Sequence, residues 1–497
     1  MRNVFRWFAA VAVAAAFCTP AIAQMGGMGG GMGGMGGGMG GGGMGGMGGG
    51  GMGGGGMGGG GMGGGGMGGG GMGAGGIVID ANGVLRTTMV VDPMLAARRR
   101  QAFEALDGDL QKRVPLRYVA LSRLEAEVAK AAASGRGIPD EMLKLAGLTR
   151  VQYVFIYPSE GSAPGEVVIA GPAEAWMTDA AGRTVGAETG APTLLLEDLA
   201  AAIRAFPPGQ PASRALACSI DPTQEGLAAL QEYLRRVGKV NPKADVSSLV
   251  SSMREALGPQ TVRVDGVSPA THFAHVMIEA DYRMKLIGIG LERPPVKMST
   301  WIQLATAQSV ASNALQRWYF LPDYRCLRVS EDDLAIELVG QGVRLAGADE
   351  VVLPDGRRMS ADRASQASKL FTTAFTSKYP EIAARRPVFA QLRSLIDLSV
   401  VAAWLQEHDG YGKAAWGAET LRDESAYPIE TVQPVVQVET AINAVWRGPR
   451  LITPIGGGVT IQPRMALDPA NLLMDEEETV AKAHATASAI PADRWWW

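Results

Sequence analysis

The body of the chain carries both helical and strand periodicity. Apolar residues spaced three and four apart predict helices over residues 93–110, 121–133 and 269–287. An alternating apolar run predicts a strand at residues 151–157, and a short Gly/Pro loop leads to its expected antiparallel partner at residues 166–170. Helices and strands do not alternate regularly, as they do in a barrel or a doubly wound sheet. The pattern therefore predicts an α+β fold with mixed or antiparallel sheets and packed helices.

Turn and capping signals set several boundaries. An Asn-Gly pair at positions 82–83 lies between short apolar runs and predicts a hairpin. Asp221 can cap a helix whose first position suits Pro222. Farther along, the pattern predicts a helical block over residues 360–406 and a β-rich stretch over residues 431–462.

Composition divides the chain into five parts. The clearest internal linker is the Pro/Gly-rich segment 207–211, where we place a domain boundary. The predicted parts are a signal peptide (1–23), a disordered Gly/Met-rich segment (24–76), a first α+β domain (77–206), a second α+β region that holds the helical block (212–475), and a C-terminal tail (476–497).

The first two dozen residues have the pattern of a signal peptide. Arginines precede an apolar stretch at residues 7–17. Ala21 and Ala23 are small residues at the two positions that a signal peptidase recognises, so cleavage is expected before Gln24. The apolar stretch is too short to span a bilayer, which takes about 20 helical residues, and no later segment is long and apolar enough. We expect an exported protein, periplasmic, in the cell envelope or secreted, with no transmembrane segment after cleavage.

The segment after the signal peptide is almost wholly glycine and methionine, in repeats that settle into GGGGM. Such a chain buries too little surface to offset the entropy of ordering glycine, so we expect it to be disordered. Three roles fit this composition. They are a flexible spacer, a set of adaptable apolar contacts to a partner, and thioether ligands for a soft cation such as Cu(I).

Charge and cysteine content narrow the class of protein. Removing Arg2 and Arg6 with the signal peptide leaves 44 basic against 49 acidic residues and takes the net charge from -3 to -5, which argues against a nucleic-acid partner. The two cysteines that survive, Cys218 and Cys326, are too few for a disulfide scaffold. Two states are open for them: one disulfide, or two separate buried thiols.

The long helix predicted over residues 269–287 is the best candidate for chemistry. His272, His275 and Glu279 fall within about 60° of one another on it, so three side chains that can bind a metal share one face. The competing interpretation is an ordinary amphipathic helix, in which Glu279 pairs with His275 and with Arg283. That arginine would repel a cation, and the His-Glu-x-x-His spacing of zinc peptidases is absent.

Other catalytic and cofactor signatures are missing. The chain has no G-x-S-x-G nucleophile elbow, no phosphate-binding G-x-x-x-x-G-K-[ST], and no G-x-G-x-x-G between a strand and a helix. We therefore assign no catalytic residue and no cofactor. The three tryptophans at positions 495–497 are unusual, and three placements are open for them: docked on the body, facing a partner, or at a membrane interface.

Four short segments resemble a known family. They are residues 79–85, 168–174, 279–285 and 455–459. Together with the signal peptide and the glycine-rich leader, they resemble an exported family of planctomycete bacteria that carries domain of unknown function 1598. The resemblance covers about residues 77–462. It implies export and a large globular domain, and it implies no activity, substrate or catalytic residue.

Two classes of function follow. The first is a non-catalytic interaction or structural module that holds an unknown envelope or extracellular protein partner. The second is a metal-handling protein or a metal-dependent enzyme, which would use His272, His275 and Glu279 or the methionines of the leader.

Elemental analysis separates these classes. The purified mature chain is exposed to zinc and to Cu(I) beside a version that starts at Ile77, and an interaction module is predicted to hold neither metal. Zinc held by both versions and lost on His275→Ala would instead support an enzyme. Cu(I) held only by the longer version would make the leader a soft-metal trap.

Overall fold

The computed structural model describes residues 74–90, 93–161, 164–213, 215–238, 246–306, 314–352, 358–360, 365–443, 445–447, 450–452 and 458–497. These residues all belong to one compact unit, Gly69–Trp497. The predicted signal peptide, and the predicted disordered segment up to residue 73, lie outside the described residues.

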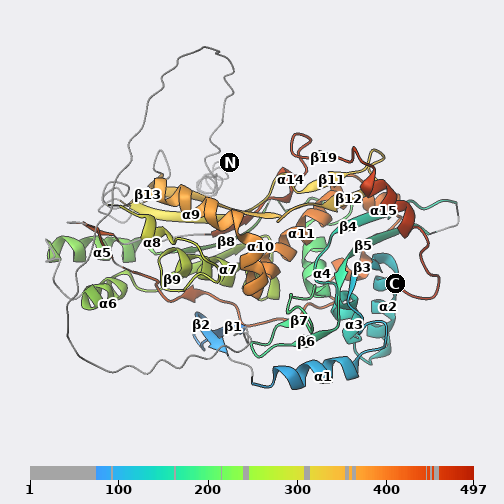
Figure 1. Ribbon diagram of the computed structural model, residues 1–497, viewed down its shortest axis with the longest axis horizontal. Coiled ribbons are helices and arrows are strands. Elements are labelled where there is room, and N and C mark those ends of the chain that lie inside the picture. Colours follow the sequence, from blue (N-terminus) through green and yellow to red (C-terminus); the bar gives the residue numbers. More distant parts are fainter. Residues whose placement is uncertain are drawn as a thin grey trace, which may run out of the picture. The chain divides into compact units, whose positions relative to one another are not determined.

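Two large sheets organise the described fold (Figure 1). In spatial order, the nine-stranded sheet contains β1 (Ala74–Ile79), β2 (Val84–Val90), β15 (Gln437–Val438), β9 (Gln260–Asp265), β8 (Leu216–Asp221), β18 (Gly458–Ile461), β10 (Ala314–Pro322), β13 (Val343–Val352) and β14 (Arg358–Ser360). The six-stranded sheet contains β19 (Leu473–Met474), β11 (Leu327–Val329), β12 (Ala335–Leu338), β4 (Tyr153–Tyr157), β5 (Glu166–Ala173) and β3 (Val114–Ala120).

Both sheets are mixed, which confirms the predicted α+β class. Most neighbouring strands are antiparallel, while β2 with β15, β10 with β18, and β11 with β19 are parallel. Two separate ribbons pair β6 (Trp176–Thr178) with β7 (Thr184–Gly186), and β16 (Val445–Arg447) with β17 (Arg450–Ile452).

Helices pack against these sheets. Those described are α1 (Leu95–Ala105), α2 (Leu121–Ser134), α3 (Asp140–Leu143), the 3-10 turn η1 (Leu145–Gly147), α4 (Leu196–Ala205), α5 (Gln224–Val237), α6 (Val246–Leu257), α7 (His272–Gly288), α8 (Trp301–Leu304), α9 (Gln366–Ser377), α10 (Tyr379–Arg385), α11 (Pro387–Glu407), α12 (Gly410–Lys413), α13 (Glu419–Arg422), α14 (Pro463–Ala466) and α15 (Thr479–Ala487). Helix α7 contacts β8, β10 and β18 of the nine-stranded sheet, and it also contacts α4 and α11.

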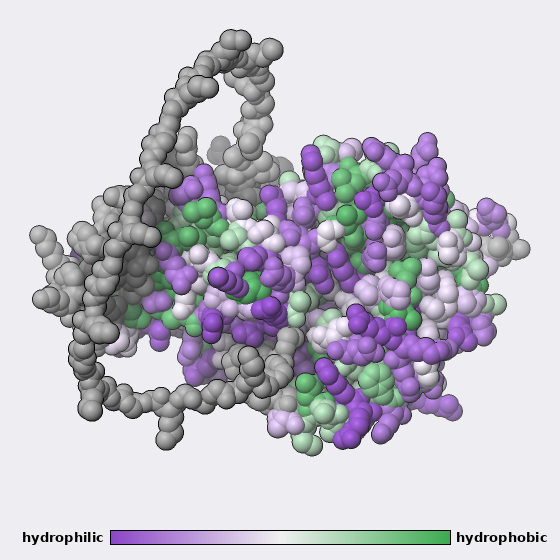
Figure 2. All heavy atoms as spheres, viewed as in Figure 1, coloured by the Kyte–Doolittle hydropathy of each residue, from purple (hydrophilic) through white to green (hydrophobic). Residues whose placement is uncertain are grey.

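Helix α11 is mostly apolar. The expectation that no later segment is long and apolar enough to span a bilayer was wrong by length and composition, because α11, alone among the described helices, passes both measures. However, 94% of that window is buried inside the fold. Such burial is typical of a core helix. On the face in Figure 2, hydrophilic and apolar residues are interspersed, as they are on ordinary protein surfaces.

The predicted hairpin is confirmed, but it begins three residues earlier than expected. Strands β1 and β2 pair from Ala74↔Val90 to Ile79↔Leu85, so residues 74–76, which we assigned to the disordered segment, belong to the folded body. In the turn, the Asp80 carboxylate accepts hydrogen bonds from two backbone amides, and Gly83 adopts φ +74°, a conformation that favours glycine.

The predicted cap of α5 is wrong by two residues. Thr223 is the N-cap, and its hydroxyl accepts a hydrogen bond from the Gly226 amide at 3.0 Å. Asp221 instead ends strand β8, where its carboxylate lies 3.0 Å from the Arg317 guanidinium. Asp221 pairs with Thr261 of β9 and stays in the strand, so Thr223, the next polar residue, caps the helix.

Strands from both sides of the 207–211 linker share each large sheet. Strand β2 pairs with β15, and β4 pairs with β12. The domain boundary at this linker stays a prediction. The tail, residues 476–497, contains α15 and then returns to pair with β3.

Cys218 and Cys326 are both free and buried, so the structure favours two separate thiols over a disulfide. Burial raises the pKa of the Cys326 thiol to about 12, and it raises the pKa of Cys218 well above its usual value. Both thiols are therefore protonated and unreactive at neutral pH.

Replacing the cap tests this account of α5. Thr223→Ala is expected to lower the free energy of unfolding by about 1 kcal/mol, because the Gly226 amide loses its partner. Thr223→Ser keeps the hydroxyl and is the matched control. Urea unfolding measures both, and equal stabilities for the two variants would contradict the assignment.

Candidate functional site

Helix α7 is surrounded by protein although it carries many charges. Thr271 caps it, and every residue from Val276 to Gly288 is buried. The buried set includes Glu279, Asp281, Arg283 and Lys285, which are at most 4% exposed. Because an unpaired charge in such a place is costly, each of these groups needs a partner of opposite sign.

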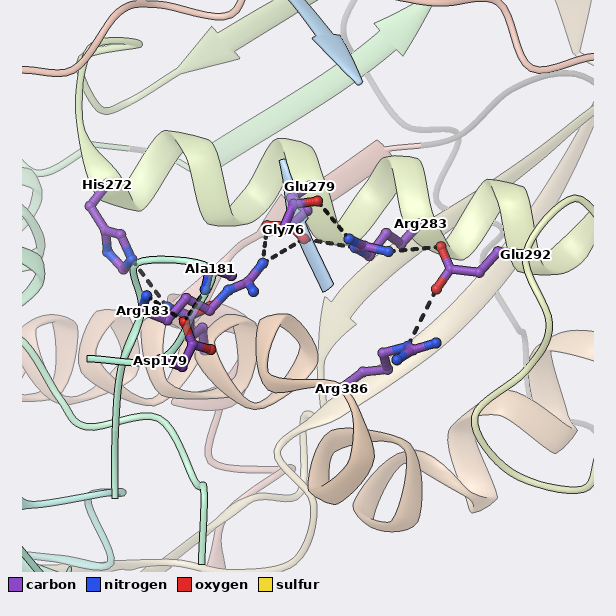
Figure 3. Close-up of polar contacts among 10 residues, drawn as sticks. Gly76, Asp179, Ala181, Arg183, His272, Glu279, Arg283, Glu292 and Arg386 are labelled. Atoms are coloured by element: carbon purple, nitrogen blue, oxygen red, sulfur yellow. Dashed lines mark hydrogen bonds and ion pairs between the residues drawn. The ribbon is translucent and has the colours of Figure 1, made fainter. Parts of the chain in front are cut away.

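Glu279 lies between two guanidinium groups (Figure 3). Arg183, from the turn between β6 and β7, places Nη2 2.7 Å from both carboxylate oxygens of Glu279. Arg283, one turn farther along α7, donates from Nε to Oε1 at 2.7 Å. Both oxygens of Glu279 are therefore occupied by charged donors.

The same network continues beyond Arg283. Its Nη1 donates to Glu292 at 2.9 Å, and its Nη2 donates to the carbonyl of Gly76 at 2.9 Å. The other oxygen of Glu292 lies 3.4 Å from Nε of Arg386. Burial would lower the pKa of the Arg283 guanidinium, but the carboxylates of Glu279 and Glu292 outweigh that effect and raise it.

A second buried pair lies on another side of α7. Lys285 Nζ is 3.0 Å from the Asp281 carboxylate and donates to the carbonyl of Ile220 at 3.0 Å. Burial raises the pKa of Asp281 to about 6, although Lys285 opposes the shift. This pair ties α7 to strand β8.

His272 begins α7 and bridges two other helices. Its Nδ1 lies 2.9 Å from the Asp198 carboxylate of α4, and its Nε2 lies 3.1 Å from the Gln391 amide nitrogen of α11. Burial lowers the pKa of His272, but Asp198 outweighs that effect and the pKa is raised overall. Nδ1–H donates to the carboxylate, which fixes the orientation of the ring.

The three predicted metal ligands thus have three separate environments. The ring of His275 lies 2.8 Å from the carbonyl of Gln433, so the expected pair of His275 with Glu279 does not form. The expected pair of Glu279 with Arg283 does form. Across the described residues, no group of three His, Cys, Asp or Glu side chains is arranged to hold a metal ion. The structure therefore offers the metal prediction no supporting geometry.

A pocket of about 410 Å³ lies at the start of α4, where Leu195 and Glu197 form part of its wall. Its volume is within the range of small-molecule sites. The wall is formed by Ala132, Gly135, Gly137, Ile138, Leu143, Lys144, Leu195, Glu197, Ala426, Tyr427, Pro428 and Glu430. Apolar and aromatic groups thus surround two carboxylates and one ammonium group.

Glu197 is the most perturbed charge in this pocket. Burial, together with the neighbouring carboxylates of Asp198 and Glu430, raises the pKa of its carboxyl to about 7, although His272 and Lys144 oppose the shift. Because this pKa is higher in the folded chain than in the unfolded chain, ionised Glu197 weakens folding above pH 7. That lost stability returns as the pH falls through 7 toward 4.5.

No feature of the sequence pointed to Glu197. Two acidic residues in the first turn of a helix, as at positions 197 and 198, are ordinary because they suit the helix dipole. Only the packing of α4 against α7 separates their roles. Asp198 orients a histidine, while Glu197 lines a pocket.

Part of the chain matches a known protein family. Residues 218–301 match DUF1598, described as a protein of unknown function. This DUF1598 segment runs from within β8 to the first residue of α8 and contains α7 with His272, His275 and Glu279. Of the four segments that carry the resemblance, it includes residues 279–285. Comparison with curated proteins and with solved structures found no match.

Removing the shared carboxylate tests the α7 network. Glu279→Gln is expected to lower the free energy of unfolding by about 3–5 kcal/mol, because two buried guanidinium groups lose their anion. The matched control is Glu127→Gln, which breaks a surface pair with Lys130 and should cost less than about 0.5 kcal/mol. Similar losses in urea unfolding would mean that the network contributes little to stability.

Proposed function

We propose that this chain is an exported, non-catalytic interaction module that holds a cationic ligand group in the pocket beside Glu197. The observation that carries the proposal is the pocket itself. It places the carboxylates of Glu197 and Glu430 among apolar side chains, and Lys144 is the one cationic residue in its wall.

Export is supported by the sequence of the first two dozen residues. Arginines, a short apolar stretch and Ala21-Ile22-Ala23 have the order of a cleavable signal. The mature chain would start at Gln24 and act in the periplasm, in the cell envelope or outside the cell. The planctomycete affiliation, and a resemblance that extends beyond residues 218–301, belong to this proposal as well.

A binding role is supported by the state of the reactive side chains. The Glu279 carboxylate is held by Arg183 and Arg283, and His272 is held by Asp198 and Gln391, so these groups act as structural links. Glu197 differs because the only ammonium group that lines its pocket is Lys144. The Lys144 ammonium also lies 4.0 Å from Asp140.

A cation is the ligand chemistry that this environment favours. Near neutral pH the folded chain keeps the Glu197 carboxyl partly protonated, because burial and neighbouring carboxylates oppose its charge. An ammonium group placed in the pocket would offset both effects. The apolar wall, which includes Ile138, Leu143 and Leu195, would bury the hydrocarbon part of such a ligand.

Butylammonium is a simple probe of this pocket. Because the pKa of Glu197 is about 7, the carboxylate is about one tenth ionised at pH 6 and about nine tenths ionised at pH 8, whereas an alkylamine stays charged. Its affinity for the mature chain is therefore expected to rise about tenfold between these pH values, as measured by titration calorimetry.

Three controls test whether the pH dependence comes from the charge of Glu197. Butanol has a similar apolar body without charge and should show no pH dependence. Glu197→Gln should remove the pH dependence, while Glu424→Gln, a carboxylate outside the pocket wall, should leave it intact. Binding of butylammonium that is equal at pH 6 and pH 8 would contradict the proposal.

A further inference from the structure

The residues after α15 form an added strand on the six-stranded sheet. Strand β3 is an edge of that sheet, with β5 as its partner on one side. On the other side Tyr118 exchanges two backbone hydrogen bonds with Trp497, at 3.0 and 3.1 Å, and the Ala120 amide donates to the Trp495 carbonyl at 2.8 Å. Val119 and Trp496 form an antiparallel bridge between these bonds.

Side chains hold this tryptophan segment, residues 488–497, on both faces of the sheet. The ring of Trp497 stacks on Tyr118, with centroids 5.2 Å apart and an interplanar angle of 13°. Trp496 takes the other side, where the Arg117 guanidinium lies 5.4 Å from its ring centroid. Trp495 is only 7% exposed and belongs to the main core cluster. Each of the three rings therefore has a different partner: Tyr118, Arg117 and the main core.

The rest of the segment is partly exposed, although the Arg123 guanidinium donates to the Pro491 carbonyl. Residues 492–494 are exposed, and a hollow of about 490 Å³ lies beside Trp496, lined by Asp107, Gly108, Asp109, Asp493 and Arg494. Three backbone hydrogen bonds join the segment to β3, whereas β3 pairs with β5 along most of its length. Because β3 keeps β5 as a partner, release of the segment would leave this sheet paired, at the cost of exposing Trp495.

Strand β3 also has the sequence of an edge. Pro115 lacks a backbone donor, so this strand suits the outside of a sheet. An open edge presents unpaired backbone groups and is a template for another strand. In this structure the template is filled by a segment of the same chain.

We propose that the outer edge of β3 is a strand-accepting interaction site for a second copy of this chain, whose tryptophan segment replaces the one bound in cis. The occupant has the chemistry already seated there, an extended backbone that presents Trp495, Trp496 and Trp497. Two copies that exchange these segments form the same contacts between chains that one copy forms within itself. This site is separate from the pocket beside Glu197 and does not rest on the function proposed for it.

A peptide of residues 488–497 with a fluorescent label tests the site directly. The mature chain carrying Trp495→Ala and Trp497→Ala should bind this peptide at least tenfold more tightly than the unaltered chain, whose edge is occupied. A peptide with the same two replacements should not bind. Adding Tyr118→Ala to the altered chain should abolish binding, and Tyr118→Phe, which keeps the stacking ring, should preserve it. Equal binding by the altered and unaltered chains, or none by either, would overturn the proposal.

Two further measurements test whether two copies exchange segments and whether the segment leaves the edge in the unaltered protein. Sedimentation of an equimolar mixture of altered and unaltered chains should show a mixed dimer, in which the unaltered chain donates its segment; monomers alone at high concentration would overturn exchange. In hydrogen exchange on the unaltered chain, the amides of Tyr118 and Ala120 should exchange faster than those of β5. Exchange of all these amides at one common rate would show that the segment leaves only when the whole fold opens.

Discussion

One buried carboxylate, that of Glu279, links elements from widely separated parts of the chain. It binds Arg183 from the β6–β7 ribbon and Arg283 from its own helix, each at 2.7 Å. Arg283 in turn reaches the carbonyl of Gly76 in β1 and the carboxylate of Glu292. Because the helix is buried, each charge depends on its partner, and α7 can occupy this place only when the surrounding elements are assembled.

Because the charges of α7 must be paired inside the fold, most of its polar side chains already have partners. The α7 face that could have gathered a metal is used to join elements together, and His272 is used to join α4 and α11. Glu197, one residue before Asp198 on α4, faces the pocket beyond this network. Asp198 is therefore held by His272, while burial and neighbouring carboxylates raise the pKa of Glu197 to about 7.

Local structure could be predicted from the sequence, and the site could not. The Asn-Gly turn and the apolar periodicity of α2, α7 and α11 depend on neighbours in the sequence, and the structure contains these elements. The cap of α5 was misplaced because strand pairing holds Asp221. Strand β3 was missed because Pro115, which has no backbone donor, argues against a strand in a sequence pattern.

The chemistry of α7 depends on distant residues. His272, His275 and Glu279 do share one face of the helix, but their partners come from positions 198, 433 and 183. No periodicity within α7 could show these contacts. The tryptophans of the tail posed the same problem, since their partners, Tyr118 and Ala120, are more than 370 positions away along the chain.

Titration of the Glu197 carboxyl tests the functional account most directly. The chemical shift of its side-chain carboxyl carbon, assigned with Glu197→Gln, would be followed against pH in the mature chain with and without saturating butylammonium. The account predicts a midpoint near pH 7 in the free chain, and a clearly lower midpoint when the cation is bound. A midpoint near that of an exposed glutamate, unchanged by the cation, would contradict the assignment of this pocket as the binding site.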